Sequence, residues 1–310
     1  MRIVNFIREA SFNDAQSARL IRLGELIDVP SGEQTEEQTI AFLADADYAL
    51  ISPATVPKIT PRMFSESDNL KGIIVNTTNL GWVDMTAAKA SGVNVFNIPG
   101  YSTEAVAEFT IGLIFAAARN ISRADREVKE KLVRSFEGFD GIELQSRTLG
   151  LIGFGDIGRR VAELAAGIGM EILVWNRTEK RLGGVTFVSK EELLVKSDIV
   201  SLHLALTPDT VRILSRKDMA LMRLGAILVN TAREELIDQS ALLEMLKAKR
   251  LRRYAFELNE EEWTDIRREI VALPNVIATP HIGWLTPEAK ARMMEEVVRR
   301  CEELASGSST

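Results

Sequence analysis

The chain contains two histidines in 310 residues, and one of them, His281, lies in the segment IATPHIGWLTPEA at 277–289. Imidazole is suited to proton transfer near neutral pH, because its ordinary pKa is about 6.5. A histidine among apolar residues is also often a packing residue whose ring nitrogens are satisfied by neighbours. The role of His281 therefore depends on which other chemical groups the sequence places with it.

A glycine motif in the middle of the chain is typical of dinucleotide binding. The segment GLIGFGDIGRRVA spaces Gly153, Gly155 and Gly158 as G-x-G-x-x-G, directly after an apolar run and at the start of a helical pattern. In that context the glycines permit a tight turn, the approach of a pyrophosphate, and close packing of helix on strand. Asp156 and Ile157, between the glycines, belong to the same predicted site. A strand–turn–helix without a ligand is the alternative.

The turn after the next apolar run bears on the choice of cofactor. An NAD site usually places Asp or Glu there to accept hydrogen bonds from the ribose 2′-hydroxyl. This chain has Asn176, Arg177 and Thr178, followed by Lys180 and Arg181. A cation in place of the carboxylate favours a 2′-phosphate, so we predict NADP, with NAD possible; a solvated basic turn is the alternative.

Short apolar segments alternate with helical patterns along the whole chain. Expected strands cover 2–7, 48–52, 72–78 and 93–98 in one series, and 148–155, 171–176, 198–204, 225–231, 252–258 and 275–280 in a second. Helical patterns lie between them, as at 35–46 and 84–92. This alternation is typical of parallel sheets covered by helices on both faces. The predicted fold class is α/β, with two doubly wound parallel-sheet domains.

Two longer helical patterns, at 101–132 and 286–305, predict how the domains are connected. We expect the chain to leave the first domain near Gly100, build the second, and return with its last helix. The predicted domains are therefore 1–99 plus 285–310, for the substrate, and 100–284, for the dinucleotide.

Composition excludes several classes of function. A net charge of −6 and a pI near 5.3 argue against nucleic acid or an anionic membrane surface as the main partner. The single cysteine, Cys301, excludes an internal disulfide and indicates a reducing compartment. The apolar stretch at 109–118 is too short to span a bilayer, and the first ten residues lack the features of a signal peptide. We expect a soluble, cytoplasmic protein without a metal site.

Taken together, these features resemble the D-isomer-specific 2-hydroxyacid dehydrogenases, a family that includes glyoxylate and hydroxypyruvate reductases. The resemblance extends over about residues 48–300 and is carried by the segments 94–108, 150–162, 197–246 and 277–289. It implies a Rossmann cofactor domain inserted into a flavodoxin-like substrate domain, and a homodimer built partly on 101–132. It also implies an oxidoreductase that transfers hydride between NAD(P)H and a small 2-keto acid or D-2-hydroxy acid, such as glyoxylate or hydroxypyruvate.

The resemblance assigns the chemistry to three residues. Arg233 would bind the carboxylate and carbonyl of the keto acid together, which suits a planar guanidinium better than an ammonium. His281 would give a proton to the carbonyl as hydride arrives. Glu262 would pair with His281, raise the pKa of its imidazole and fix its tautomer. The other histidine, His203, would line the cofactor crevice as a structural residue.

Further positions follow from the same resemblance. Beyond the residues already named, those expected at the cofactor are Leu204, Ala205, Thr210, Thr231, Ala232, Arg233, Glu257, His281 and Gly283. Those expected at the substrate are Thr77, Thr78, Asn79, Arg233 and His281.

The chain also departs from the family pattern. Thr77 and Asn79 stand where the family's substrate loop has glycines, which puts the size and identity of the substrate in doubt. Glu234 replaces a glycine after the arginine, Glu257 replaces an Asp, and Trp263 replaces a proline.

Two alternatives to the reductase stay open. The first is a dinucleotide-sensing, corepressor-like protein of the same fold, which would bind the cofactor but catalyse little turnover. Retention of Arg233, Glu262 and His281 favours the enzyme. A phosphoglycerate dehydrogenase is the alternative within the family, although we see no room for a regulatory domain in 310 residues.

Overall fold

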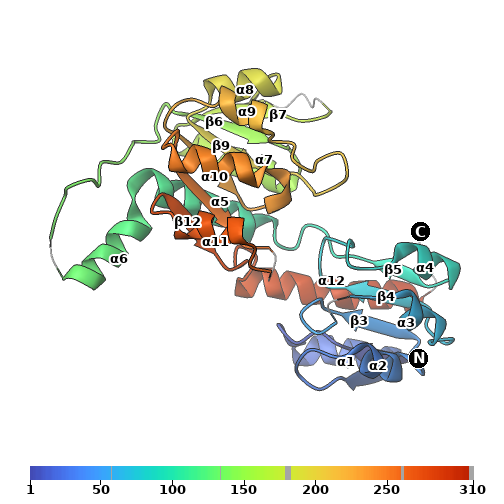
Figure 1. Cartoon of the computed structure of the whole chain (residues 1–310). Coiled ribbons are helices and arrows are strands. Elements are labelled where there is room, and N and C mark those ends of the chain that lie inside the picture. The colour runs from blue at the N-terminus through green and yellow to red at the C-terminus, as the bar shows by residue number, and fades with distance from the viewer. Residues whose placement is uncertain (57, 133, 179–182, 260–261, 307–310) are drawn as a thin grey trace. The chain divides into compact units, whose positions relative to one another are not determined.

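The computed structural model describes residues 1–56, 58–132, 134–178, 183–259 and 262–306. Within it the chain forms two compact units (Figure 1). The first unit comprises Met1–Ser102 together with Thr286–Thr310, and the second comprises Thr103–Leu285. Each unit contains one parallel sheet with helices on both faces, so the predicted α/β class is confirmed.

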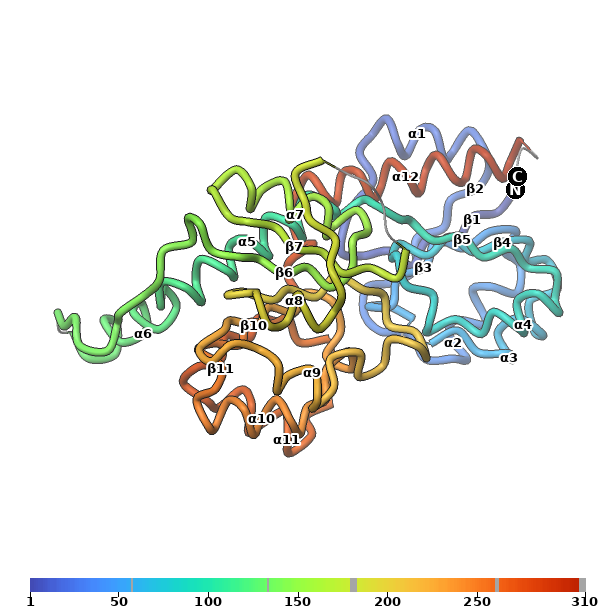
Figure 2. The backbone as a smooth tube through the Cα atoms, turned by 90° about the horizontal axis from the view of Figure 1, so that it is seen from above, coloured from blue at the N-terminus to red at the C-terminus, as the bar shows by residue number. Residues whose placement is uncertain are grey.

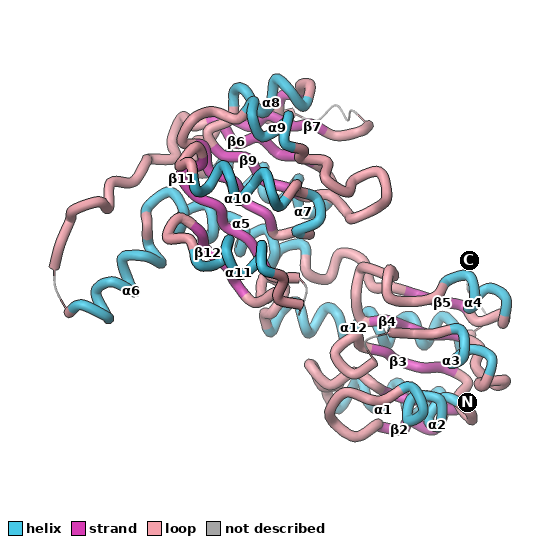
Figure 3. The backbone as a smooth tube through the Cα atoms, in the orientation of Figure 1, coloured by secondary structure: helices cyan, strands magenta, loops and turns pink. Residues whose placement is uncertain are grey.

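The sheet of the first unit has the order β2-β1-β3-β4-β5, and all its strand pairs are parallel (Figure 3). This is the flavodoxin-like order, in which the direction of winding reverses between β1 and β3. The elements of the unit are β1 (Arg2–Asn5), α1 (Asp14–Leu23), β2 (Glu25–Asp28), α2 (Glu36–Leu43), β3 (Tyr48–Ile51), α3 (Pro61–Ser65), β4 (Gly72–Val75), α4 (Met85–Ala90), β5 (Asn94–Phe96) and α12 (Pro287–Ala305).

The C-terminal helix α12 belongs to the first unit. Its apolar side, which includes Met293 and Val297, is buried, and α1 lies beside it (Figure 2). Arg19 of α1 reaches Glu295 at 2.6 Å and Glu302 at 2.7 Å on α12. These contacts hold the last helix against the first.

The sheet of the second unit has the order β12-β11-β10-β9-β6-β7-β8, which is the Rossmann order with one additional strand. The elements of the unit are α5 (Thr103–Arg119), α6 (Ile121–Lys131), β6 (Thr148–Ile152), α7 (Asp156–Gly167), β7 (Glu171–Trp175), β8 (Thr186–Phe187), α8 (Lys190–Lys196), β9 (Ile199–Leu202), α9 (Arg216–Leu221), β10 (Ala226–Asn230), the 3₁₀ helix η1 (Glu234–Leu236), α10 (Gln239–Lys247), β11 (Leu251–Glu257), α11 (Asp265–Ala272) and β12 (Val276–Thr279).

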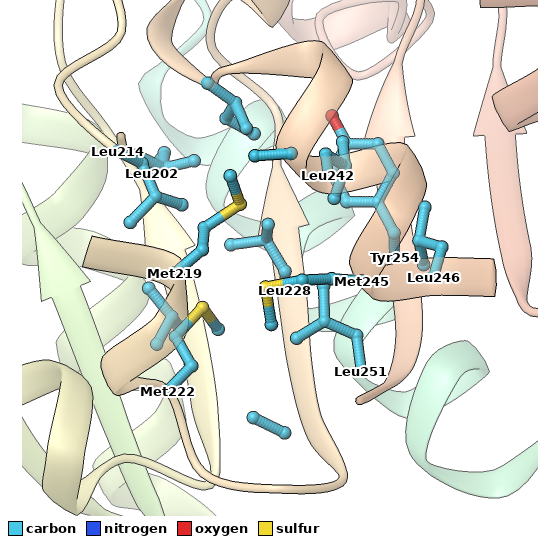
Figure 4. Close-up of a cluster of buried hydrophobic side chains, with 14 of the residues drawn as sticks. Leu202, Leu214, Met219, Met222, Leu228, Leu242, Met245, Leu246, Leu251 and Tyr254 are labelled. Carbon is cyan, nitrogen blue, oxygen red and sulfur yellow. The ribbon is translucent and has the colours of Figure 1, made fainter. Parts of the chain in front are cut away.

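Both faces of the second sheet are covered, which is why its strands are almost continuously apolar. One face packs Leu228 and Tyr254 against Met219 and Met245 of the neighbouring helices (Figure 4). The opposite face contributes Val229 to a second cluster with α5 and α7. The sheet is therefore held rigidly enough to fix the loops at its carboxyl edge.

The prediction of one continuous helix over 101–132 is wrong. The chain bends by 62° between α5 and α6. Asn120, at the bend, adopts a left-handed conformation with φ 59°, which asparagine tolerates better than most residues. Its buried amide donates to the carbonyls of Phe139 and Asp140 at 3.1 and 3.2 Å, so tertiary contacts fix the break.

No single helix among the described residues has both the length and the apolar character needed to cross a membrane, and the bent pair α5–α6 passes that test only by length and composition.

Candidate active site

The glycine motif forms an open cradle between β6 and α7. Gly153 has φ +100°, and a Cβ there would lie 2.4 Å from the His203 carbonyl oxygen. A Cβ at Gly158 would lie 2.5 Å from the Gly153 oxygen. At Gly155, by contrast, a Cβ would meet nothing within 4 Å. Two glycines are thus required by packing, and the third leaves the backbone open to a ligand.

The N-terminus of α7 lies at this opening. Gly155 is its N-cap residue and provides no side-chain hydrogen bond, whereas Asn13 caps α1 and Thr35 caps α2 with theirs. The first amides of α7 are therefore left for another acceptor, and a helix N-terminus favours an anion. These residues fit the pyrophosphate of a dinucleotide.

His203 lies beneath the cradle as a neutral structural residue. Its Nε2 is 2.9 Å from Ser201 Oγ, and burial lowers the pKa of the imidazole to about 4. The following loop is braced by Thr210, whose Oγ1 donates to the Ala205 carbonyl at 2.8 Å. His203 thus supports the cradle without a charge.

The 176–178 turn is tied to the cradle by Asn176. Its Oδ1 accepts from the Phe154 backbone N–H at 3.2 Å, and its Nδ2 donates to the Thr178 carbonyl at 2.8 Å. Arg177 is exposed and forms no ion pair within the described residues. Lys180 and Arg181, which contributed to the NADP prediction, lie outside the described residues.

Arg233 follows β10 at the carboxyl edge of the second sheet. Asn230 shapes this turn, because it accepts from the Ala232 N–H at 3.0 Å and donates to the Arg233 carbonyl at 2.8 Å. The guanidinium is anchored through Nη1, which donates to Asn259 Oδ1 at 2.9 Å and to the Ala232 carbonyl at 3.0 Å. Thr231 is held to α5 by a 2.9 Å contact between its hydroxyl and that of Thr110.

Behind Arg233 lies a buried network that the sequence analysis missed. Glu234 is 4% exposed and forms an ion pair with Arg267 at 3.2 Å. Its other oxygen accepts from the Asn259 backbone N–H at 3.4 Å. Burial raises the pKa of Glu234 against the opposing effect of Arg267. The signal available in the sequence was the replacement of glycine by Glu234; its partners are distant along the chain.

Glu257 holds the turn that carries His281. Its Oε1 accepts from the backbone N–H groups of Ile282 at 2.6 Å and Gly283 at 2.9 Å. A Cβ at Gly283 would lie 2.7 Å from Glu257 Oε2, so a larger residue there would displace this carboxylate. His281 itself has φ 57°, a conformation that a non-glycine residue seldom adopts without surrounding support. Burial raises the pKa of Glu257.

The structure brings Arg233 and His281 together. Burial lowers the pKa of His281, and the positive charge of Arg233 lowers it further, while a hydrogen bond with the Leu258 backbone acts in the opposite direction. The carboxyl ends of β10 and β12, with β11 between them, thus place a guanidinium and an imidazole at one edge of the sheet.

Glu262, in contrast, is not brought to His281. It is exposed, and its backbone carbonyl accepts a hydrogen bond from Arg267 Nη1. No ion pair joins Glu262 to His281 within the residues that the structure describes. In this structure burial and the charge of Arg233 lower the pKa of His281, so the rise expected from a pairing with Glu262 is not seen.

The predicted substrate loop lies in the first unit, directly after Asn76. Its side chains brace the loop itself. Thr77 Oγ1 donates to the Asn79 carbonyl at 2.9 Å, and Asn79 Oδ1 accepts from the Gly81 N–H at 2.8 Å. The Thr78 carbonyl accepts from Asn97 Nδ2 at 2.7 Å. These bonds give the loop the rigidity that glycines would not provide.

In the described parts of the chain, no group of three or more His, Cys, Asp or Glu side chains could hold a metal ion.

Residues 111–283 match the D-isomer specific 2-hydroxyacid dehydrogenase, NAD binding domain. A hydroxypyruvate reductase of Thermotoga maritima is 36% identical over 290 residues, covering 93% of this chain and 94% of that protein. A glyoxylate reductase of Aeropyrum pernix is 35% identical over 274 residues, covering 85% of this chain and 81% of that protein.

A solved structure extends the comparison to the whole chain. The acyclic imino acid reductase Bsp5, in complex with NADPH and D-Arg, has a TM-score of 0.89 and 32% identity, covering 99% of this chain and 98% of that chain. The open glycine cradle and the presence of Arg233 and His281 at one sheet edge agree with these similarities. The chain therefore belongs to the D-isomer-specific 2-hydroxyacid dehydrogenases, and it is an NAD(P)-linked oxidoreductase of 2-hydroxy and 2-keto acids.

Proposed function

We propose that the protein is an NADPH-preferring reductase of glyoxylate, hydroxypyruvate or a similar 2-keto acid. The observation that supports the proposal is that Arg233 and His281 lie at the same sheet edge as the open cradle at Gly155, with the charge of Arg233 acting on the imidazole. When bound, the reduced cofactor supplies the hydride that reduces the keto carbon. The residues of the chain then have to hold the substrate and deliver one proton.

Arg233 is proposed to hold the acid end of the substrate. Its Nη1 is occupied by Asn259 and the Ala232 carbonyl, so the Nε–Nη2 edge is available to a carboxylate and the neighbouring carbonyl oxygen. A planar, two-point contact of this kind fixes both position and rotation of the keto acid. In the other unit, Thr77, Thr78 and Asn79 are proposed to contact the substrate, with the braced loop limiting its size.

His281 is proposed as the proton donor to the carbonyl oxygen, and as the base in the reverse reaction. Glu262 remains the proposed partner that would stabilise the imidazolium. For the cofactor, the proposed contacts are Gly153, Gly155, Asp156, Ile157, Gly158, Asn176, Arg177, Thr178, Leu204, Ala205, Thr210, Thr231, Ala232, Arg233, Glu257, His281 and Gly283. We place the enzyme in the cytoplasm, as its single cysteine suggests.

A panel of 2-keto acids, assayed with NADPH and with NADH, tests this function. Steady cofactor oxidation with glyoxylate or hydroxypyruvate supports it. Tight NADPH binding without turnover of any acid would contradict it and favour a dinucleotide sensor. Because one relative is named an acyclic imino acid reductase, each acid is assayed with and without ammonia or methylamine. A rate that requires the amine would identify the C=N compound as the substrate.

Cofactor preference should depend on the 176–178 turn. Arg177 can donate charge-assisted hydrogen bonds to a 2′-phosphate, each worth about 1.5–3 kcal/mol, or about 10- to 100-fold in affinity. NADPH should therefore exceed NADH in kcat/KM, and the advantage should decrease at high salt. The double change Asn176→Asp with Arg177→Ala should reverse the order.

The matched control for the cofactor test is Arg216→Ala, which removes an exposed arginine of the same unit. It should leave the NADPH/NADH ratio unchanged. A wild-type preference for NADH would mean that Arg177 does not contact the cofactor.

The network behind Arg233 should affect the KM for the keto acid. Asn259→Leu removes the acceptor of Arg233 Nη1, so the guanidinium loses its fixed orientation. We expect the KM for the keto acid to rise about tenfold or more, as the loss of a hydrogen bond to a charged group implies. Asn259→Asp keeps the acceptor and should recover most of the loss. An unchanged KM in the leucine variant, measured by steady-state kinetics, would show that Asn259 does not position Arg233.

We also propose a homodimer built on α5, α6 and the segment that follows. The residues of α6 are all at least partly exposed, and the helix projects from its unit (Figures 1 and 2). Leu132 is 86% exposed and Phe136 is 75% exposed, an apolar pair that a stable monomer would be expected to cover.

Sedimentation velocity at micromolar concentration should give a dimer. Leu132→Glu with Phe136→Glu should shift the protein towards monomer. Val195→Glu, at an exposed apolar position on α8, serves as the control and should leave the dimer intact. A wild-type monomer would refute the assignment.

A further inference from the structure

A polar cluster lies at the carboxyl edge of the first sheet. Glu9 lies in the loop after β1, Ser52 directly follows β3, and Asn76 directly follows β4. The strand order reverses between β1 and β3. Open α/β sheets bind their ligands outside the carboxyl ends of the strands at such a point. The cluster thus occupies the position at which this fold accommodates a ligand.

The carboxylate of Glu9 has no cationic partner in the described chain. Its Oε1 accepts hydrogen bonds from Ser52 Oγ and, at 2.9 Å, from Asn76 Nδ2, and its Oε2 accepts from the Arg8 backbone N–H at 2.9 Å. The guanidinium of Arg8 pairs instead with Asp28 at 3.3 Å. Burial raises the pKa of Glu9, but these hydrogen bonds more than compensate and lower it below the ordinary value. The group is therefore ionised at neutral pH.

The cluster has acceptor capacity that no described donor uses. Asn76 is 2% exposed, yet its Oδ1 has no hydrogen-bond partner. A buried polar atom left unpaired costs about 1–3 kcal/mol, and an ionised carboxylate with no cation beside it is also unfavourable when partly removed from water. The stability of the fold does not account for two such groups in contact, whereas a ligand that donates hydrogen bonds to the cluster would account for them.

There is room for a ligand at the Glu9 side of the cluster. Glu9 lines a cavity of about 500 Å³ between the β1–α1 loop and α12. Ser11 and Gln16 contribute polar side chains to it, and Arg8 and Lys290 also line it, neither of them in an ion pair with Glu9 in the described chain. Tyr101 is also near, since burial and the charge of Glu9 together raise the pKa of Tyr101 to about 12.

We propose that Glu9 is a specificity-determining residue that binds a protonated nitrogen, an ammonium or guanidinium group, at the end of the substrate's side chain. The proposal rests on the proposed reductase function and extends its substrates to 2-keto acids with a cationic side chain. Asn76, which donates to Glu9, immediately precedes the 77–79 loop proposed to contact the substrate. A cationic side chain can donate a charge-assisted hydrogen bond to Glu9, whereas an apolar or anionic side chain cannot.

The test compares three probes with the wild-type enzyme and NADPH: α-keto-δ-guanidinovalerate, the aliphatic α-ketocaproate and the anionic α-ketoglutarate. We expect the guanidino acid to exceed the aliphatic acid in kcat/KM by about 10- to 100-fold, as one charge-assisted hydrogen bond implies, and the anionic acid to be the poorest. Glu9→Gln preserves the shape of the side chain and should bring the guanidino/aliphatic ratio close to one. Glu37→Gln removes an exposed carboxylate from α2 in the same unit and should leave the ratio unchanged.

The outcomes separate this proposal from the proposed function. Turnover of the aliphatic acid equal to or better than that of the guanidino acid overturns the role of Glu9 while the reductase stands. The same follows if Glu9→Gln leaves the ratio intact. The wild-type panel decides the matter even if the Glu9 variant does not fold. No turnover of these probes, of glyoxylate or of hydroxypyruvate overturns the reductase and this proposal together.

Discussion

Replacement of His281 by alanine should lower kcat for keto-acid reduction by about 10²- to 10⁴-fold, the usual contribution of a positioned general acid. The dissociation constant of NADPH should change little, because the imidazole is proposed to act on the substrate. Stopped-flow turnover and fluorescence titration of NADPH measure the two quantities separately. The matched control is His203→Gln, because His203 hydrogen-bonds Ser201 and is not proposed to transfer a proton. Activity within a few-fold of wild type in the His281 variant would rule out its role as the acid.

The pH profile tests the state of His281. Reduction requires the protonated imidazole, and burial and Arg233 lower its pKa from 6.5. The rate of reduction should therefore decrease as pH rises through a value below 6.5, while the reverse oxidation should increase over the same range. If Glu262 pairs with His281 in the working enzyme, the transition lies higher, and Glu262→Gln should move it to lower pH. A profile that Glu262→Gln leaves unchanged would remove Glu262 from the acid–base chemistry.

The second large effect is expected at Arg233. Arg233→Lys should be almost as damaging as Arg233→Ala, because an ammonium cannot contact a carboxylate and a carbonyl through a planar, two-point edge. Two charge-assisted hydrogen bonds of about 1.5–3 kcal/mol each correspond to a loss of at least ~10²-fold in kcat/KM. Arg216→Lys, at an exposed ion pair with Glu244, is the control for the substitution. A lysine variant with wild-type kcat/KM would exclude the two-point contact.

Most of the fold could be predicted from the sequence because the strands of a parallel sheet are buried on both faces. Apolar segments such as 148–155 and 225–231 have to be buried on both faces, and they form β6 and β10 in the middle of the sheet. The pattern fails where a strand lies at an edge. β2 (Glu25–Asp28) is only partly buried, and β8 (Thr186–Phe187) has two residues, so neither produces a continuous apolar run. The bend at Asn120 was missed because it depends on contacts with Phe139 and Asp140.

Site residues could be predicted from the sequence where they lie close to the carboxyl end of a strand. Arg233 and His281 lie shortly after β10 and β12, whose carboxyl ends are at the same edge of the sheet with β11 between them. Glu262 lies farther from its strand, beyond two residues that the structure does not describe, so its position depends on the loop. Asn259 could not be assigned from the sequence either, since its contact with Arg233 depends on how two separate loops meet.

Because α6 is exposed, we expect it to become stable later in folding than the cores of the two units. It has 11 residues and no buried side chain, and an isolated helix of that length is marginal in water. Its local support consists of pairs one turn apart, such as Arg123–Glu127 and Asp125–Lys129, each worth only a few tenths of a kcal/mol. The two units can reach their native cores while α6 still exchanges between helix and coil. In the proposed homodimer, the surface that covers Leu132 and Phe136 would stabilise the helix, so formation of the dimer would complete the folding of this part of the chain.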